Sequence, residues 1–440
     1  MPHNSDLARQ QPVAPVAGAS LNDWLSYLEA IHPVEIDLGL DRVLTVFRRL
    51  FRRPPKARVV TVAGTNGKGS AVTCLAGLLR QAGRSVGTYT SPHLHRYNER
   101  VMINGTPASD ERLVCAFEAV EAARGATSLT YFEFGTLAAF QVLAEAGVED
   151  WVLEVGLGGR LDAVNVVDPE LAIITSVDID HVAFLSDDRE VIGFEKAGIL
   201  RQGKPAIYAD IDPPSSVLQQ VSAQRIPLLR LGVDYSLADQ DGRTVLSLPS
   251  AKGLAGAELV IPEMTLPLNS VAAAVVAALM LEPGIGLDTV TAALRNITLP
   301  GRFERLASEP DVVVDVGHNP HAARWLARQV VLRCRSGGKI RAIYGALSDK
   351  DIEGVVREMK GAVDEWYLVG LDCPRGLSSE ELGRRCAEPL SGAVQSSYPS
   401  VESAIKQVRV DADTRDLVIV FGSFFTVADA RLALGAENAS

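Results

Sequence analysis

Hydrophobic residues along the chain form short β-branched runs that alternate with longer segments of helical periodicity. The strand-like runs are RVVTVAG (58–64), DWVLEVG (150–156), ELAIITSV (170–177) and KPAIYAD (204–210). Amphipathic stretches lie between them at 110–125 and 133–147. Because strands that alternate with helices are typical of parallel sheets covered by helices, the pattern predicts α/β layers with a mostly parallel sheet.

The pattern changes twice further along the chain. Between about 221 and 268 short strand-like runs are separated by Gly, Asp and Ala turns, which favours an edge meander. After Thr298 a Pro-Gly breaker precedes a second alternation, with strands expected within 311–320, 339–347, 364–372 and 416–424. The sequence therefore predicts a flexible leader at 1–20, a P-loop ATPase-like domain over 21–299 and a smaller Rossmann-like α/β domain over 300–440.

Composition excludes two classes of partner. The 440 residues carry a net charge of −11 and no stretch concentrates Lys and Arg, which argues against a nucleic-acid-binding surface. The longest apolar run, VAAAVVAALML (271–281), is shorter than the roughly 20 residues that a membrane span needs, so it predicts a buried helix. Five scattered cysteines without a C-x-x-C pair are typical of reduced thiols in a cytoplasmic protein.

A glycine-rich turn joins strand to helix in VVTVAGTNGKGSAVTC (59–74). The backbone N–H groups of such a turn and the helix dipole form a phosphate site, and Lys68 can reach the terminal phosphates. The ordinary P-loop pattern fails twice, because Val62 stands at its first glycine and Gly69 separates Lys68 from Ser70. Metal ligands are therefore expected at other strand ends, since the usual hydroxyl after the lysine is missing. A tight turn with a surface lysine is the alternative.

Ten blocks in a fixed order carry a resemblance to a known family. They are AGTNGKGS (63–70), TSPHLHRYNERVMING (90–105), LTYFEFGTLAAF (129–140), LEVGLGGRLDAVNVV (153–167), SVDIDHVAFL (176–185), EKAGI (195–199), LPGRFE (299–304), DVGHNPHAA (315–323), LSDKD (347–351) and FGSFFTVADA (421–430). They resemble the Mur ligase superfamily of ATP-dependent amide-forming ligases. Within it they resemble the folylpolyglutamate synthase family, including the bifunctional members that also make dihydrofolate. The resemblance covers nearly the whole chain from about Trp24 onward.

The resemblance implies a reaction and its participants. ATP converts a pterin carboxylate into an acyl phosphate, and the amine of L-glutamate attacks that intermediate. The implied partners of this monomeric enzyme are dihydropteroate, tetrahydrofolate and its polyglutamates, L-glutamate and ATP. The enzyme must neutralise phosphate charge and hold two anions and an amine in line.

The resemblance also implies two Mg²⁺ ions per site. Glu154 ends a predicted strand before a glycine turn, the position that favours ligand-binding groups in α/β sheets. The resemblance makes Glu154, Ser91 and His181 magnesium ligands, and it makes Lys196 a lysine that CO₂ carbamylates to hold the second ion. Local alternatives stay open: His181 as a core histidine, Ser91 as the start of a turn, and Lys196 as a free amine beside phosphate.

The remaining roles are implied by the same blocks. The resemblance places ATP contacts at Thr65, Asn66, Gly67, Lys68, Gly69, Ser70, Asn269, Arg302 and Asp315. It places the glutamate site at His318 and Ser423, and catalytic functions at Lys68, Lys196 and His318. It places the pterin at Thr130, Tyr131, Phe132, Glu133, Leu161, Asp162 and Ala163, with a further part at 35–43. Phe132 either stacks on the pterin or belongs to the core, and Gly317 departs from the alanine that is common before the histidine.

Three alternative functions remain, and each differs from the bifunctional ligase in its domains or its activity. A folylpolyglutamate synthase alone would lack the dihydropteroate activity. A cell-wall Mur ligase would need a separate domain before the phosphate loop, where only about 40 ordered-looking residues are expected. A P-loop NTPase switch would release phosphate without pterin or glutamate, whereas the ligase requires both.

Overall fold

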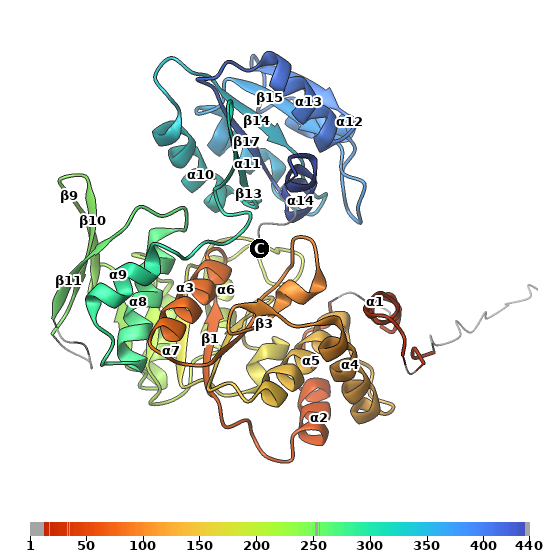
Figure 1. Cartoon of the computed structure of the whole chain (residues 1–440), viewed down its shortest axis with the longest axis vertical. Coiled ribbons are helices and arrows are strands. Elements are labelled where there is room, and N and C mark those ends of the chain that lie inside the picture. The colour runs from red at the N-terminus through yellow and green to blue at the C-terminus, as the bar shows by residue number, and fades with distance from the viewer. Residues whose placement is uncertain are drawn as a thin grey trace, which may run out of the picture.

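The computed structural model of the protein describes residues 13–16, 18–32, 34, 36–250, 254 and 256–435. In this part of the chain the two larger of three sheets support two lobes, one above the other in Figure 1. Most of the leader predicted at 1–20 lies outside the described residues, as does Glu35 of the 35–43 segment. No helix of the described chain is both long and apolar enough to cross a membrane.

The first lobe is built on an eight-stranded sheet with the order β4-β3-β2-β5-β1-β6-β7-β8. The strands are β1 (Arg58–Ala63), β2 (Val86–Tyr89), β3 (Val101–Ile103), β4 (Thr106–Pro107), β5 (Asp150–Glu154), β6 (Leu171–Ile174), β7 (Ala206–Tyr208) and β8 (Leu228–Arg230). All pairings are parallel except those of β3 with β2 and β4. The predicted mostly parallel sheet is therefore confirmed. Its central strand β1 is apolar because helices cover both faces.

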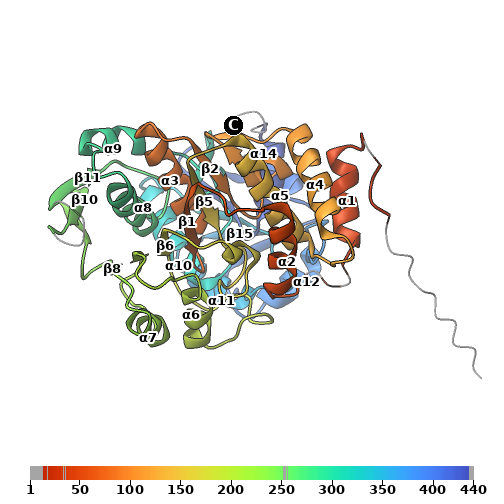
Figure 2. The same ribbon diagram turned by 90° about the horizontal axis from the view of Figure 1, so that it is seen from below.

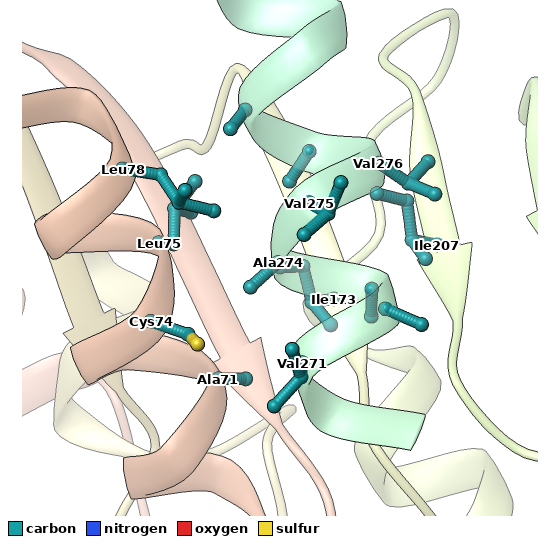
Figure 3. Packing of buried hydrophobic residues seen from close by; sticks show 14 of the residues in the cluster. Ala71, Cys74, Leu75, Leu78, Ile173, Ile207, Val271, Ala274, Val275 and Val276 are labelled. Carbon is teal, nitrogen blue, oxygen red and sulfur yellow. The ribbon is translucent and has the colours of Figure 1, made fainter. Parts of the chain in front are cut away.

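Helices cover both faces of this sheet (Figure 2). On one face lie α3 (Lys68–Gln81), α8 (Leu268–Leu281) and α9 (Leu287–Leu294); on the other lie α1 (Leu21–Ala30), α2 (Asp41–Leu50), α4 (Asp110–Arg124) and α5 (Tyr131–Ala146). In Figure 3 Ala71 of α3 lies opposite Val271 of α8, and Leu75 and Leu78 lie on the side toward Ala274 and Val275. The apolar run 271–281 is thus a buried helix, as predicted.

The first lobe contains further helical elements. They are the helices α6 (Arg189–Ala197) and α7 (Ser215–Ala223), and the 3₁₀ turns η1 (Tyr97–Arg100) and η2 (Ala163–Val166). The meander predicted at 221–268 is only partly right. Strands β9 (Ser236–Gln240), β10 (Arg243–Leu248) and β11 (Ala257–Ile261) form their own antiparallel sheet. Strand β8 instead extends the parallel sheet beside β7, because its Leu228 and Leu229 are buried there.

The second lobe has a six-stranded sheet with the order β12-β13-β17-β14-β15-β16. Its strands are β12 (Glu304–Ser308), β13 (Asp311–Asp315), β14 (Ile340–Tyr344), β15 (Glu365–Val369), β16 (Val394–Tyr398) and β17 (Leu417–Phe421). Its helices are α10 (Pro320–Arg333), α11 (Ile352–Lys360), α12 (Ser379–Cys386), α13 (Val401–Asp411) and α14 (Phe424–Ala433). Only β12 pairs antiparallel, which confirms the predicted Rossmann-like α/β arrangement.

Candidate active site

The glycine-rich turn between β1 and α3 has a backbone that only glycine adopts easily. Gly64 has φ +153°, and a Cβ there would lie 1.8 Å from Thr175 Oγ1. Gly67 has φ +81°, and a Cβ there would lie 2.3 Å from Ser270 Oγ at the start of α8. No side chain caps the N-terminus of α3. The first N–H groups of α3 are therefore available to an anion, as a phosphate loop requires.

Polar side chains of the loop are held in place around this N-terminus. Thr65 Oγ1 donates to the Asp178 carbonyl at 3.0 Å. Lys68 Nζ folds back over the loop and donates to the carbonyls of Gly64 at 3.0 Å and Thr65 at 3.2 Å. Burial lowers the pKa of Lys68, while Glu154 and Asp180 oppose that change. The Ser70 hydroxyl is buried without a hydrogen-bond partner among the described residues, so it is free to meet a phosphate or a metal.

Two predicted metal ligands lie together beside the loop. Glu154 ends β5 and is 5% exposed, and its Oε2 accepts a hydrogen bond from the Ser91 backbone N–H at 3.2 Å. Gly69 passes close by, since a Cβ there would lie 3.5 Å from the same oxygen. Burial raises the pKa of Glu154, and Lys68 lowers it. A buried carboxylate that makes no ion pair within the described chain is suited to hold a cation.

The other two members of the predicted metal set lie across the loop. His181 and Lys196 line a small cavity together with Lys68 and the glycine turn at 156–158. Burial lowers the pKa of His181 to about 4, so its imidazole is neutral and able to bind a metal. Burial and the nearby Lys68 lower the pKa of Lys196 to about 7.

The described residues contain no group of three His, Cys, Asp or Glu side chains that could hold a metal. The predicted set fits a magnesium ion only if oxygen ligands complete it, such as the Ser91 hydroxyl, phosphate oxygens and water. Glu154, whose buried carboxylate forms no ion pair with any described residue, is the member of this set that favours a cation.

Hydrogen bonds join the loop to the second lobe. The Asn66 and Asn319 side-chain amides exchange two hydrogen bonds of 3.0 Å each. Asn319 Nδ2 also donates to Asp180 Oδ2 at 3.0 Å, and Lys350 Nζ donates to Asp180 Oδ1 at 2.9 Å. His318 Nε2 lies 3.5 Å from Asp180 Oδ2. The loop and the predicted glutamate residue His318 are therefore parts of one network.

Asp180 is the centre of that network. Although burial raises its pKa, the hydrogen bond from His318 and the nearby positive charges hold the pKa of Asp180 well below its usual range. Reasoning from sequence assigned no role to Asp180, Asn319 or Lys350. The sequence could have indicated these residues, because each lies in a block that carries the family resemblance: SVDIDHVAFL, DVGHNPHAA and LSDKD.

Two of the other residues predicted to contact the nucleotide lie in the linker and the second lobe. Asp315 ends β13, and its carboxylate accepts from the backbone N–H groups of Phe303 at 2.9 Å and Gly317 at 2.7 Å. The Arg302 guanidinium lies 5.1 Å from the centre of the Phe424 ring. Burial lowers the pKa of Arg302, and the charges of Asp315 in the second lobe and Glu154 in the first oppose this. Asn269 is exposed at the start of α8, next to Ser270.

Ser423 lies at the end of β17 but its hydroxyl is already used. It caps α14 by accepting from the Thr426 N–H at 3.0 Å, and it is buried. In His318, Nδ1 contacts the Val316 carbonyl at 3.0 Å while Nε2 faces Asp180. Both residues predicted for glutamate therefore already have polar partners, since the Ser423 hydroxyl caps α14 and the two ring nitrogens of His318 contact the Val316 carbonyl and Asp180.

Several predicted pterin residues hold local structure. Thr130 and Glu133 form the capping box of α5, and Glu133 also pairs with Arg42 at 2.9 Å. Asp162, between Leu161 and Ala163, caps η2 and accepts from the N–H groups of Leu157 and Val164. Burial raises the pKa of Asp162 to about 6. The capping box was readable as T-x-x-E in the sequence.

The aromatic residues of the same segment form a wall. The Phe132 ring packs against Gly156, where a Cβ would lie 2.5 Å from it, and its centre is 6.1 Å from that of Tyr89. The Tyr131 ring is 6.2 Å from that of Tyr97. Phe132 is packed against the core, which is the alternative that the sequence left open, and it borders the glycine turn of the site.

Comparison with known proteins agrees with this geometry. The Mur ligase middle domain matches residues 62–243, and the Mur ligase glutamate ligase domain matches residues 301–424. The chain is 41% identical over 426 residues to the dihydrofolate synthase/folylpolyglutamate synthase of Escherichia coli (strain K12), which covers 96% of this chain and 98% of that protein.

Two solved structures show what similar chains bind. FolC of E. coli in complex with DHPP and ADP has a TM-score of 0.90 and 39% identity, and the match covers 96% of this chain and 99% of that chain. A bifunctional folylpolyglutamate synthase/dihydrofolate synthase with Mn, AMPPNP and L-glutamate bound has a TM-score of 0.86 and 42% identity, with 96% and 100% covered.

Proposed function

The chain belongs to the dihydrofolate synthase/folylpolyglutamate synthase family of Mur ligases, and we propose that its two lobes act together on one ATP. It is an ATP-dependent ligase that joins L-glutamate to dihydropteroate, which gives dihydrofolate, and to reduced folates, which gives folylpolyglutamates. The observation that carries the proposal is the pair of hydrogen bonds between Asn66 of the phosphate loop and Asn319 of the second lobe.

The reaction has two steps. A carboxylate oxygen of the pterin acid attacks the γ-phosphorus of ATP, the bond from that phosphorus to the β-phosphate oxygen breaks, and ADP leaves. The amine of L-glutamate then attacks the acyl carbon, loses one proton, and phosphate leaves. Lys68 and the free N–H groups of α3 neutralise phosphate charge in the first step. Contact between the lobes excludes water, which would hydrolyse the acyl phosphate.

For the metal, we assign the ligands Ser91, Glu154 and His181. The buried Glu154 carboxylate beside Ser91 and the neutral imidazole of His181 support this set. When bound, Mg²⁺ neutralises charge on the phosphates. The chain's own part is to hold these oxygen and nitrogen atoms around the loop.

A second magnesium ion would be held by a carbamate on Lys196. The neutral amine reacts with CO₂ to give a carbamate anion and one proton, which turns a cation into an oxygen ligand. This needs an unprotonated amine at physiological pH, and burial of Lys196 favours that form. Intact mass measured in bicarbonate should show one added CO₂ that Lys196→Met lacks.

Residues of both lobes would complete the site. Asn269, Arg302 and Asp315 are assigned to the nucleotide, and His318 with Ser423 to L-glutamate. Arg302 supports this because the charges of Asp315 of the second lobe and Glu154 of the first both act on it. We assign residues 21–299 to the ATP and pterin domain, residues 300–440 to the glutamate domain, and the active form to a monomer. The five unpaired cysteines support a cytoplasmic location.

The test is substrate dependence. Purified protein with ATP, Mg²⁺, dihydropteroate and L-glutamate should release ADP and form a product heavier than dihydropteroate by one glutamyl residue. Omission of either acid should abolish ADP release. A folylpolyglutamate synthase alone would use tetrahydrofolate but not dihydropteroate. ADP release that is indifferent to both acids would indicate an NTPase switch and contradict the ligase.

A further inference from the structure

Arg100, the last residue of η1, carries a positive charge that no carboxylate of the described chain pairs. Its guanidinium carbon lies 5.3 Å from the centre of the Tyr97 ring and 5.7 Å from that of Tyr131. Its Nε donates to His93 Nδ1 at 2.9 Å. Two aromatic rings and one imidazole therefore fix the plane of the guanidinium. Its two terminal nitrogens make no hydrogen bond to any described residue.

The position of Arg100 connects the pterin wall with the metal residues. Its carbonyl accepts from the N–H of Thr90 at 2.9 Å, and the next residue, Ser91, donates to Glu154. Tyr131, one of the two rings beside it, belongs to the predicted pterin segment. Arg100 thus contacts the pterin segment through its side chain and the strand end before Ser91 through its backbone.

Three cations act on the Glu154 carboxylate, and two of them already have a role. Lys68 covers the phosphate loop, and Arg302 comes from the linker toward the second lobe. Arg100 is the third and lies on the pterin side. A carboxylate that must approach the γ-phosphate is repelled by it, so the approach needs a fixed positive charge on the pterin side.

We propose that Arg100 binds the carboxylate of the pterin acid and holds it for phosphorylation. This assignment rests on the proposed ligase function and adds the residue that recognises the acid. A guanidinium whose Nε is occupied still offers two terminal nitrogens to the two carboxylate oxygens. The same contact serves dihydropteroate and folates, because both present a carboxylate at the end that is extended.

The test compares an acid with its neutral analogue. Dihydropteroate and its carboxamide are titrated without ATP against the full-length protein, Arg100→Gln and Arg100→Lys. Arg96→Gln is the matched control, since Arg96 lies in the same segment, is 71% exposed and pairs with Asp110. We expect Arg100→Gln to weaken binding of the acid by about 10- to 100-fold. Binding of the carboxamide should stay unchanged, Arg100→Lys should be intermediate, and Arg96→Gln should match the wild type.

Other outcomes overturn the assignment. Equal losses for acid and carboxamide, or misfolding of both Arg100 variants by circular dichroism, would make Arg100 a structural residue. Unchanged binding of the acid would remove it from the site. If the wild type forms the glutamyl product while Arg100→Gln binds both probes normally, only this assignment fails. If the wild type forms no product, the ligase function itself fails.

Discussion

Replacing Lys196 by Met tests whether the buried amine of Lys196 destabilises the folded protein while being required for activity. Lys196 is 4% exposed in the last turn of α6, and within the described chain its ammonium makes no hydrogen bond or ion pair. Burial is the main cause that lowers its pKa from 10.5 to about 7, and Lys68 adds to the effect. Met has a similar length and no charge, so the variant should keep the packing and remove the buried amine.

The magnitude follows from proton linkage. Between pH 7 and 10.5 the native state binds fewer protons at Lys196 than the unfolded state, so the wild-type stability rises with pH there. At 1.36 kcal/mol per pH unit, the destabilisation is about 5 kcal/mol below pH 7, about 3 kcal/mol at pH 8 and under about 1 kcal/mol at pH 10. Without CO₂, Lys196→Met should be more stable than the wild type by these amounts, and it should lose ligase activity.

Urea unfolding in CO₂-free buffers at pH 6, 8 and 10 measures this difference. The matched control is Lys406→Met, because Lys406 is exposed and makes only an ion pair with Glu402 one helical turn away. The control should change the free energy of unfolding by about 0.5 kcal/mol or less at each pH. A Lys196→Met variant that is less stable at all three pH values, or a difference that does not shrink from pH 6 to pH 10, would refute the reasoning.

Three further substitutions test the phosphate loop and the second lobe. Lys68→Ala should lower kcat for ADP release by about 10²- to 10³-fold with little change in Tm, because within the described chain its ammonium bonds only to the loop carbonyls of Gly64 and Thr65 and forms no ion pair. A large fall in Tm would make Lys68 structural. His318→Ala should raise KM for L-glutamate far more than KM for ATP, and equal changes would contradict its assignment. Gly64→Ala should lower Tm and abolish binding of a fluorescent ATP analogue, because its Cβ would collide with Thr175. The control Gly361→Ala has open space and φ −70°, and it should bind the analogue normally.

Much of the fold could be predicted because local pattern and tertiary packing agree. The β-branched run 58–64 is apolar on both faces, which is typical of a central parallel strand, and it forms β1. The start of α5 was predicted at 133 but lies at Tyr131, because the capping box of Thr130 and Glu133 begins the helix there. Strand β8 was grouped with the meander, since a three-residue strand does not reveal in sequence which sheet it joins.

The sequence predicted which residues form the site better than it predicted the contacts between them. The resemblance named the residues around the loop, and the structure places Lys68, Glu154, His181 and Lys196 around it. The pairing of Asp180 with Lys350 joins residues 170 positions apart, so it depends on how the second lobe lies. The sequence did not indicate Arg100, because the proposal for it depends on the Tyr97 ring in η1 and the Tyr131 ring in α5, which only the fold brings to it.

The Asn319 side chain has no spare hydrogen-bonding capacity. Its Oδ1 accepts from Asn66 and from the Ala322 N–H in the first turn of α10, and its Nδ2 donates to Asn66 and Asp180. An amide has two donors and two acceptor positions, and all four are used here. Separation of the lobes would break the bonds of Asn319 to Asn66 and Asp180 but would leave its cap on the Ala322 N–H in place, so the start of α10 keeps its cap whether or not the lobes are in contact.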